Sequence, residues 1–311
     1  MAKITVVIPA YNAAKYIAHT LRSVLNQSFS DFSCIIVDDG STDNTAQVVT
    51  DTVGHDARFL LVQQNNAGEC AARNAGITLV QTPLLAVLDS DDLWHPDFLQ
   101  KMTTALADDT VSLVWCHFAL FFDYNGQRKL QPWANVHKTG NPWWDMLLDS
   151  VFCMGAWAAR SDVVRAAGPF DTALAIAGDR DFSLRMLAML SADGRNRVKE
   201  VPEELLYYRQ RQGSAVRNAA LALETEWSVM LPHINHAGVP PRIRKRALSF
   251  LAFKMAVIAA FAAKDYRAAL RWYAKAFYLD PLNLNIYWLP IRKILLSLRK
   301  KEKIPFVQRS K

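Results

Sequence analysis

Short apolar runs alternate with amphipathic segments along the first third of the chain. The runs are apolar at nearly every position, which is typical of parallel strands buried on both faces of a sheet. The segments between them repeat apolar residues every three or four positions, as helices with one buried face do. The predicted strands are 4–8, 32–37, 59–62 and 84–88, and the predicted helices are 13–27, 42–53, 68–80 and 96–107. This order predicts a parallel sheet with right-handed crossovers and helices on both faces.

The pattern changes after Asp109. An apolar and aromatic stretch at 111–122 ends at a turn over Asn125-Gly126, and residues 129–144 show no clear period. The later segments that we predict are a strand at 156–160, a helix at 179–190, and an edge strand or extended segment at 198–209. From residue 219 onward the chain is predicted to be helical, with helices at 247–263 and 266–279. The sequence therefore predicts an α/β fold with a mostly parallel, Rossmann-like central sheet and an all-helical C-terminal extension.

Three carboxylates follow the fourth predicted strand, in the sequence Asp89-Ser90-Asp91-Asp92. Carboxylates this close repel one another, and hard divalent cations such as Mg²⁺ or Mn²⁺ compensate that repulsion. Mg²⁺ usually takes only one or two protein carboxylates and completes its shell with substrate phosphates. The cluster therefore predicts a metal–diphosphate site at the carboxyl end of a strand. The alternative is a solvated loop in which Asp92 or a neighbour caps the next helix.

Two other strand ends carry polar or aromatic residues: Pro9-Ala10-Tyr11-Asn12 and Asp38-Asp39-Gly40-Ser41. In a parallel sheet these ends share one edge with the acidic cluster. Tyr11 could stack on a base, Asp38 and Asp39 could accept hydrogen bonds from a base or ribose, and Arg73 could add positive charge. Together they predict a nucleoside diphosphate site. Local turn and helix-capping roles explain the same Asp-Gly-Ser segment and do not exclude ligand contact.

Four ordered motifs resemble those of the family 2 inverting glycosyltransferases, which have the GT-A fold. They are Val6–Asn12, Val37–Asp43, Ala72–Gly76 and Leu88–Asp92, and the similarity continues at Arg160, Gly168–Asp171, Gly178–Phe182 and Tyr208-Arg209. The resemblance covers about residues 1–215. It implies a glycosyltransferase domain at 1–215, with a nucleotide-binding half at 1–109 and an acceptor-binding half at 110–215. Residues 216–311 would form a separate helical, basic region.

The resemblance also implies roles for single residues. Ala10, Tyr11 and Asp39 match positions that hold the nucleoside, and Asp39 matches the one that reads uracil. Pro9, Asn12, Asp38, Ser90 and Arg73 belong to the same predicted donor site, with a structural role open for Asp38. Asp89-Ser90-Asp91 matches the metal-binding D-x-D motif, in which Asp91 is the expected direct ligand of Mn²⁺ or Mg²⁺. Asp89 and Asp92 are further metal candidates, with ribose contact or support of the ligands as alternatives.

Asp179 matches the acidic general base of the family. The expected reaction moves a sugar, with inversion, from a UDP-sugar to a saccharide or lipid-linked saccharide during cell-surface glycan synthesis. Two departures from the family pattern stand out. Gly178 replaces the first acid of a Glu-Asp pair, so that Asp181 is the other candidate base. Arg211 replaces a His after Tyr208-Arg209, and we expect it to contact diphosphate, with a surface loop residue as the alternative.

Charge is distributed unevenly along the chain. Residues 216–311 contain 18 Lys and Arg against 5 Asp and Glu, a net +13, whereas the remainder carries 18 against 24, a net −6. The basic, aromatic segment 287–301 suits a helix lying on an anionic membrane leaflet. It equally suits a helix docked on its own domain with a solvated basic face. We expect no nucleic-acid partner, and the sequence does not predict an oligomeric state.

The cysteines and the N-terminus indicate a compartment. The four cysteines are scattered without metal-ligand spacing, so reduced core thiols are expected. The N-terminus lacks the basic and then apolar pattern of a signal peptide. We therefore expect a cytoplasmic protein, with a peripheral place at the inner face of the cell membrane as an open alternative.

Two other functions stay open. A sugar nucleotidyltransferase would carry a Gly-rich loop with an Arg after the first strand, where this chain has Pro9–Asn12. A non-catalytic relative that only binds nucleotide or glycan is favoured by Gly178 and Arg211. Neither a P-loop nor a G-x-G-x-x-G motif occurs in the first half, which argues against an ATPase or a dinucleotide enzyme.

Overall fold

The chain forms two compact units, residues 1–212 and 213–311. A computed structural model describes residues 2–124, 127–132, 139–148, 152–192, 197–210, 219–261 and 263–282. The predicted domain boundary after residue 215 stays a prediction, as does the further division predicted at residue 109.

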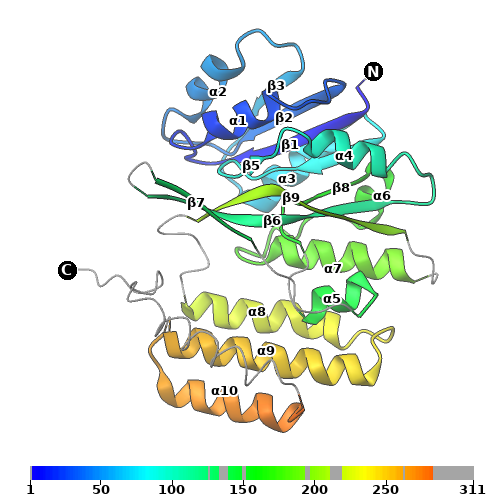
Figure 1. Cartoon of the computed structure of the whole chain (residues 1–311). Coiled ribbons are helices and arrows are strands. Elements are labelled where there is room, and N and C mark those ends of the chain that lie inside the picture. Colours follow the sequence, from blue (N-terminus) through cyan, green and yellow to red (C-terminus); the bar gives the residue numbers. More distant parts are fainter. Residues whose placement is uncertain are drawn as a thin grey trace. The chain divides into compact units, whose positions relative to one another are not determined.

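The first unit is a mixed sheet flanked by helices (Figure 1). Its described strands are β1 (Ile4–Ala10), β2 (Phe32–Asp38), β3 (Phe59–Gln63), β4 (Leu84–Val87), β5 (Leu93–Trp94), β6 (Leu113–Tyr124), β7 (Gln127–Pro132), β8 (Trp157–Arg160) and β9 (Val198–Gln210). Its described helices are α1 (Ile17–Leu25), α2 (Thr45–Val53), α3 (Glu69–Thr78), α4 (Phe98–Ala105), α5 (Pro142–Leu148), α6 (Ser161–Ala166) and α7 (Gly178–Ser191).

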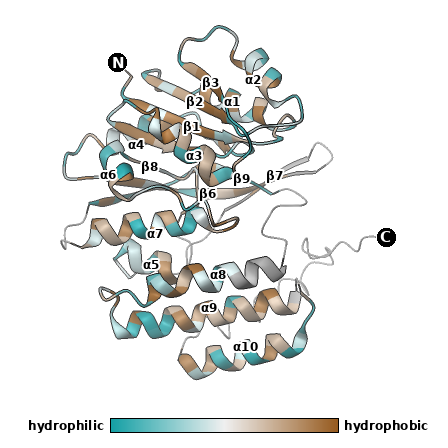
Figure 2. Cartoon of the chain, turned by 180° about the vertical axis from the view of Figure 1, so that it is seen from behind, coloured by the Kyte–Doolittle hydropathy of each residue, from teal (hydrophilic) through white to brown (hydrophobic). Residues whose placement is uncertain are grey.

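The strands follow the order β3-β2-β1-β4-β8-β6-β9-β5, and β7 pairs with β6. The first four are parallel neighbours, as predicted, and β1 is buried at all seven positions. Figure 2 shows the hydrophobic character of β1 and β2. Beyond β4 the sheet is mixed, because β8 runs antiparallel to β4 and β6 whereas β9 runs parallel to β6. The carboxyl ends of β1, β2 and β4 therefore share one edge.

The second half of the sheet differs from the prediction. Residues 198–209, predicted as an edge strand or extended segment, form β9, which pairs with β6 on one side and with β5 on the other. The edge strand is instead β5, only two residues long. A run this short shows no period, and its partner lies far along the chain. The helices α5 and α6 and the strand β7 were not predicted either, since their segments lack a clear period.

Helix α3 lies close to the sheet and also holds the segment before α7. A Cβ on Gly76 would lie 2.4 Å from Val7 Cγ1, so only glycine allows the helix to approach β1 this closely. The side chain of Asn74 donates to the Phe170 carbonyl at 2.9 Å and accepts the Phe170 N–H at 2.8 Å. These bonds fasten residues 168–178 to α3 and so fix where α7 begins.

The second unit contains the helices α8 (Ala219–Ile234), α9 (Pro241–Phe261) and α10 (Tyr266–Leu279). Helix α10 packs on α9 through a small core of Ala252, Phe253 and Ala276. Ser249 Oγ on α9 donates to the Ala276 carbonyl at 2.9 Å. Within the described residues, no helix is long and apolar enough to cross a membrane. The predicted membrane segment 287–301 lies outside the described residues.

Candidate functional site

The loops after β1 and β2 are fastened to each other at the carboxyl edge of the sheet. Asn12 has a left-handed backbone conformation with φ of 48°. Its Oδ1 accepts the backbone N–H groups of Thr42 at 2.8 Å and Asp43 at 3.3 Å. Ser41 Oγ in turn accepts the Asn12 N–H at 2.9 Å. Asn12 therefore joins the two loops, and this fixes the backbone on which Tyr11 and Asp39 lie.

Of the residues predicted at the end of β1, Tyr11 is the exposed aromatic one. Pro9 and Ala10 are buried within β1, whereas 51% of the Tyr11 side chain and backbone surface is exposed. An exposed aromatic ring can stack on a planar base, since both carry π-faces. The geometry thus keeps Tyr11 available for the predicted stacking.

The carboxylates of Asp38 and Asp39 are buried and already hydrogen-bonded. Asp39 Oδ1 accepts from Gln64 Nε2 at 2.6 Å and from the Ala67 N–H at 3.0 Å, and Oδ2 accepts from the Gly68 N–H at 2.8 Å. Asp38 accepts from the Ser41 N–H at 3.0 Å. Asp39 thus holds the loop that leads into α3. A base contact would use the remaining acceptor capacity of its oxygens, because each carboxylate oxygen has two lone pairs.

Arg73 links two carboxylates at the start of α3 and the end of β4. Its Nη2 donates to Glu69 Oε1 at 2.6 Å and to Asp89 Oδ1 at 2.8 Å, and only 4% of its side chain is exposed. Although desolvation lowers the pKa of Arg73, the carboxylates of Asp89, Glu69 and Asp179 raise it above its usual range. Arg73 therefore stays charged and holds Asp89 in place at the sheet edge.

The raised pKa of Glu69 reflects the several carboxylates around it. Arg73 lowers the pKa of Glu69, but desolvation and the carboxylates of Asp89, Asp179 and Asp91 outweigh it and raise that pKa to about 7. Asp179 lies in the first turn of α7, far along the sequence, and nevertheless acts on Glu69. The structure thus brings Asp179 into electrostatic reach of the D-x-D carboxylates, and a bound cation would relieve their repulsion.

Asp91 and Asp92 differ in surroundings. Asp92 is 1% exposed, its Oδ1 accepts the Arg209 N–H at 2.7 Å, and burial raises its pKa well above the usual range. The Asp91 carbonyl accepts from Arg209 Nε at 2.6 Å, and Asp91 itself is half-buried. The Ser90 carbonyl accepts from Thr20 Oγ1 at 2.9 Å. These bonds hold the loop on α1 and β9 and direct Asp92 inward, so Asp91 is the more accessible of the two.

Gly178 explains why α7 begins so close to α3. A Cβ on Gly178 would lie 2.5 Å from Cys70 Sγ, and Ala177 before it has a left-handed φ of 62°. The first turns of α3 and α7 are therefore in contact. This contact places Asp179 on the same side as Glu69, and it requires a residue without a side chain at the position where the family often has Glu.

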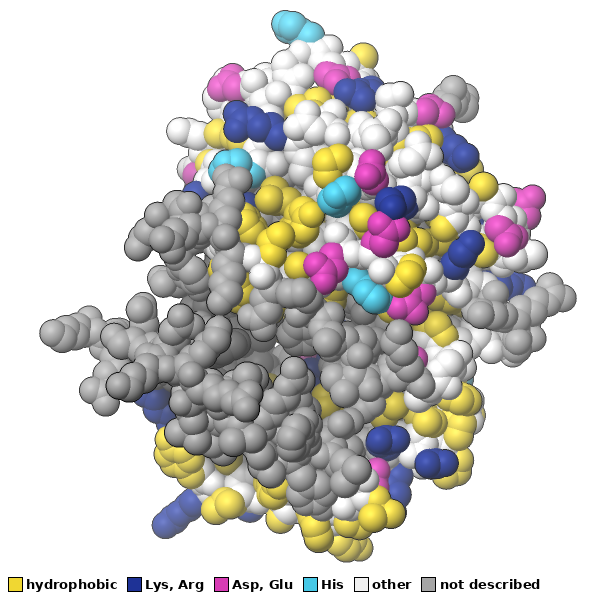
Figure 3. Space-filling view, in the orientation of Figure 1, with side chains coloured by type: hydrophobic (Ala, Val, Ile, Leu, Met, Phe, Trp, Pro, Cys, Tyr) yellow, Lys and Arg dark blue, Asp and Glu magenta, His cyan; other side chains and the backbone are white. Residues whose placement is uncertain are grey.

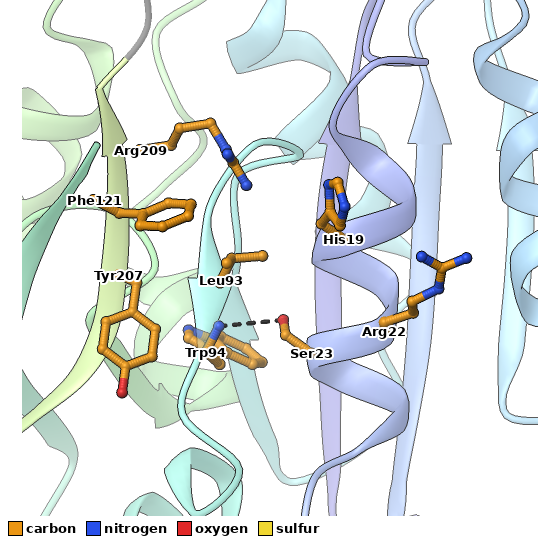
Figure 4. Close-up of a pocket in the computed structure, with 8 residues that line it drawn as sticks. All are labelled: His19, Arg22, Ser23, Leu93, Trp94, Phe121, Tyr207 and Arg209. Carbon is orange, nitrogen blue, oxygen red and sulfur yellow. Dashed lines mark hydrogen bonds between the residues drawn. The ribbon is translucent and has the colours of Figure 1, made fainter. Parts of the chain in front are cut away.

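A cavity of about 220 Å³ lies behind the acidic loop, between α1 and the strands β5, β6 and β9 (Figure 4). Its lining residues are His19, Arg22, Ser23, Leu93, Trp94, Phe121, Tyr207 and Arg209. Figure 4 shows Arg209 extending from β9 toward the cavity, near Phe121. The Arg209 Cζ atom lies 4.6 Å from the centroid of the Phe121 ring. Ser23 Oγ accepts the Trp94 N–H at 3.2 Å. Arg209 thus connects this cavity with the backbone of the acidic loop.

Sequence reasoning missed Glu69 and the contacts of Arg209. Glu69 lies four residues before Arg73 on the same helix face, a spacing that indicates an ion pair and could have identified it. Arg209 belongs to the Tyr208-Arg209 motif of the resemblance, but its contact with Asp91 and Asp92 could not be predicted, because that contact depends on how β9 pairs with β5. Arg211 lies outside the described residues. Within them, no group of three or more His, Cys, Asp or Glu side chains is arranged to hold a metal ion.

Comparison with known proteins places this site in a family. The model of "Glycosyl transferase family 2" matches residues 5–167, which contain the donor-site motifs. The chain belongs to glycosyl transferase family 2. The resemblance read from its motifs is thereby confirmed. Two curated relatives are a putative glycosyltransferase EpsH of Bacillus subtilis, 34% identical over 124 residues, and a chondroitin synthase of Pasteurella multocida, 32% identical over 141 residues. The matches cover 40% and 45% of this chain, but only 36% and 14% of those proteins.

Solved structures share the fold of this family 2 chain. Residues 1–349 of Staphylococcus aureus TarS, in complex with UDP-GlcNAc, align with a TM-score of 0.64 at 18% identity and cover 96% of this chain and 92% of that one. The mannosyltransferase PcManGT of Pyrobaculum calidifontis, in complex with GDP-Man and Mn²⁺, aligns with a TM-score of 0.63 at 19% identity, covering 96% of this chain and 81% of that one. The predicted GT-A fold class is thereby confirmed.

Proposed function

We propose that this chain is a metal-dependent inverting glycosyltransferase that uses a UDP-sugar. The acceptor is a hydroxyl of a saccharide or lipid-linked saccharide in cell-surface glycan synthesis, reached from the cytoplasm at the inner face of the membrane. One observation carries the proposal: the first turn of α7, which holds Asp179, lies against the first turn of α3 at Gly178 and Cys70, and Arg73 of α3 donates to Asp89 of the D-x-D motif at 2.8 Å. This contact supports a proposed base, Asp179, close to the proposed metal–diphosphate site, at the sheet edge that also carries the exposed Tyr11.

The donor would bind across the carboxyl ends of β1, β2 and β4. Tyr11 stacks on the base, Asp39 accepts from uracil, and Asp89 and Asp91 face the diphosphate. Structural neighbours that carry UDP, UDP-GlcNAc and GDP-Man support a nucleotide-sugar donor. Asp39 would favour uracil over cytosine, because uracil presents an imide N–H donor where cytosine presents an acceptor nitrogen.

The residues fit a divalent cation. Asp91, with Asp89 as the second candidate, offers the oxygen ligands that Mg²⁺ and Mn²⁺ prefer, and one or two carboxylates suffice when phosphates complete the shell. Two structural neighbours are described with Mn²⁺. When bound, the cation supplies positive charge that stabilises the diphosphate leaving group. Arg73 shares its charge between Glu69 and Asp89 and so positions Asp89.

Asp179 would carry the proton transfer. Its carboxylate takes the proton of the acceptor hydroxyl as that oxygen attacks the anomeric carbon, and the bond to the diphosphate breaks on the opposite face. A single displacement of this kind inverts the configuration. Asp181 is the other acid in the first turn of α7, but its Oδ2 accepts from Arg185 Nε at 2.8 Å. This ion pair leaves Asp179 as the better base.

The test compares Asp179→Asn with the matched control Asp181→Asn, which removes a carboxylate from the same helical turn. The assay measures UDP release from a panel of UDP- and GDP-sugars with and without Mn²⁺, and nucleotide binding by thermal shift. Asp179→Asn should lower turnover about 10²–10⁴-fold while nucleotide still raises Tm. Asp181→Asn should stay near wild type. Unchanged turnover in Asp179→Asn would refute the base, and binding without any turnover in the wild type would favour the non-catalytic relative.

A further inference from the structure

Exposed apolar side chains concentrate on the last described helix. Nine large hydrophobic residues are exposed in the part of the chain that the structure describes, and five of them lie within residues 266–282. They are Tyr266, Leu270, Phe277, Tyr278 and Leu282, with exposed fractions of 67%, 70%, 49%, 86% and 84%. Figure 3 shows hydrophobic and basic side chains together on the helical part of the surface. Exposed apolar clusters of this kind mark interaction sites more often than single exposed residues do.

The exposed side of α10 belongs to a well-anchored helix. Ala269 and Ala276 are buried on the opposite side, and the ring of Trp272 packs 4.9 Å from that of Trp227. Asp265 caps the helix, because its Oδ1 accepts the Ala268 N–H at 2.9 Å. The helix therefore already has a core-facing side. The small core between α9 and α10 does not include Tyr266, Leu270 or Tyr278.

Basic residues follow the exposed side in a regular stripe. Arg267, Arg271 and Lys275 are spaced four apart, so they lie on one face of α10, and all three are exposed. Lys275 also contributes to packing within the unit, because its Nζ lies 4.4 Å from the centroid of the Trp227 ring and 4.9 Å from that of Trp272. Arg267 and Arg271 repel each other slightly at this spacing, so the two arginines do not stabilise the helix. Figure 2 shows hydrophobic and hydrophilic residues interspersed along α10.

We infer that the outer face of α10, defined by Tyr266, Arg267, Leu270, Arg271 and Tyr278, rests on an anionic lipid surface. Cations attract anionic headgroups, tyrosine rings favour the membrane interface, and leucine gains by leaving water. The positive charge of this face and its exposed apolar side chains favour an anionic lipid surface over a second copy of the chain or a nucleic acid as its partner. A second copy of this face would oppose like charges, and a nucleic acid would not require exposed leucines. The inference extends the proposed function, since such docking would bring the enzyme to a lipid-linked acceptor, but lipid binding does not depend on transferase activity.

The test uses the full chain and vesicle sedimentation. Vesicles of phosphatidylcholine with phosphatidylglycerol are compared with vesicles of phosphatidylcholine alone. Arg267→Gln/Arg271→Gln should weaken binding to the anionic vesicles about 25-fold, roughly fivefold for each cation removed. Leu270→Ser/Tyr278→Ser should weaken binding and leave it more sensitive to salt. Both double variants should keep the wild-type Tm and the wild-type UDP release without vesicles.

The control is Arg242→Gln/Lys245→Gln on α9, which removes the same charge from exposed positions of the same unit. It should bind anionic vesicles like wild type. Equal losses in the control and the α10 variant would show that net charge alone is responsible and would overturn the inference. Wild-type binding in the α10 variants would overturn it too, as would a loss of self-association in sedimentation velocity without any vesicle effect. Loss of UDP release with intact vesicle binding would refute only the proposed enzymatic function.

Discussion

Replacing Gly178 with alanine should destabilise the first unit, because the new methyl group meets a buried sulfur. Its Cβ would lie 2.5 Å from Cys70 Sγ, well inside van der Waals contact. Cys70 is only 7% exposed, and its Sγ lies 3.8 Å from the Leu174 carbonyl, so the sulfur has little room to retreat. Relief would require a shift of the first turn of α7, which carries Asp179.

Two opposing terms set the size of the effect. Overpacking of a close contact costs about 1–3 kcal/mol. Alanine regains up to about 1 kcal/mol over glycine in a helix, and less at its first turn. We therefore expect Gly178→Ala to lower the free energy of unfolding by about 1–2 kcal/mol. For a unit of this size that corresponds to a decrease in Tm of roughly 2–8 °C.

A double-mutant cycle with Cys70→Ala isolates the cause. Urea unfolding is measured for the wild type, both single variants and the double variant. If the sulfur is responsible, Gly178→Ala should cost almost nothing once Cys70 is alanine, giving a coupling energy of about 1–2 kcal/mol. The reasoning is refuted if the penalty persists in the Cys70→Ala background, or if Gly178→Ala leaves Tm unchanged.

Three further predictions concern buried groups. Gly76→Ala would place a Cβ 2.4 Å from Val7 Cγ1 and should lower the free energy of urea unfolding by about 2–3 kcal/mol, and a loss below about 1 kcal/mol would contradict the close approach. Burial raises the pKa of Asp92, so ionising its carboxylate costs folding free energy as pH rises from about 4. In metal-free thermal scans, the stability of Asp92→Asn relative to wild type should therefore increase between about pH 4 and 8. A stability difference between the two proteins that does not change with pH would refute this. Burial also raises the pKa of the Cys34 and Cys116 thiols, so both stay protonated at about pH 8. They should react with a thiol reagent only after the protein is denatured. Rapid reaction of these two cysteines in the folded protein would contradict their burial.

The parallel half of the sheet could be predicted because its signals are local. Each residue of β1 is buried, and a strand buried on both faces must be apolar at every position. The acidic loop after β4 and the polar loop after β2 interrupt such runs, so the strand ends are also visible in the sequence. Their meeting at one edge then follows from the parallel order alone. The fold class and the family could therefore be read from local patterns and motif order.

The second half of the sheet and the support of the site could not be predicted in this way. The pairing of β5 with β9 places Arg209 under Asp91 and Asp92, residues that are more than a hundred positions apart in the chain. No period in the sequence encodes a partner at such a distance. The same holds for Gly178 and Cys70, whose contact sets where α7 begins.

The sequence by itself determined which chemical groups are present and at which strand ends they lie, because burial and turn formation act on neighbouring residues. Only the tertiary structure decided which partners each of these groups contacts. It turned Asp92 inward to the Arg209 backbone, engaged Asp39 with the loop before α3, and tied Asp89 to Glu69 through Arg73. A carboxylate acts according to the donors and charges around it, and packing between distant segments supplies these.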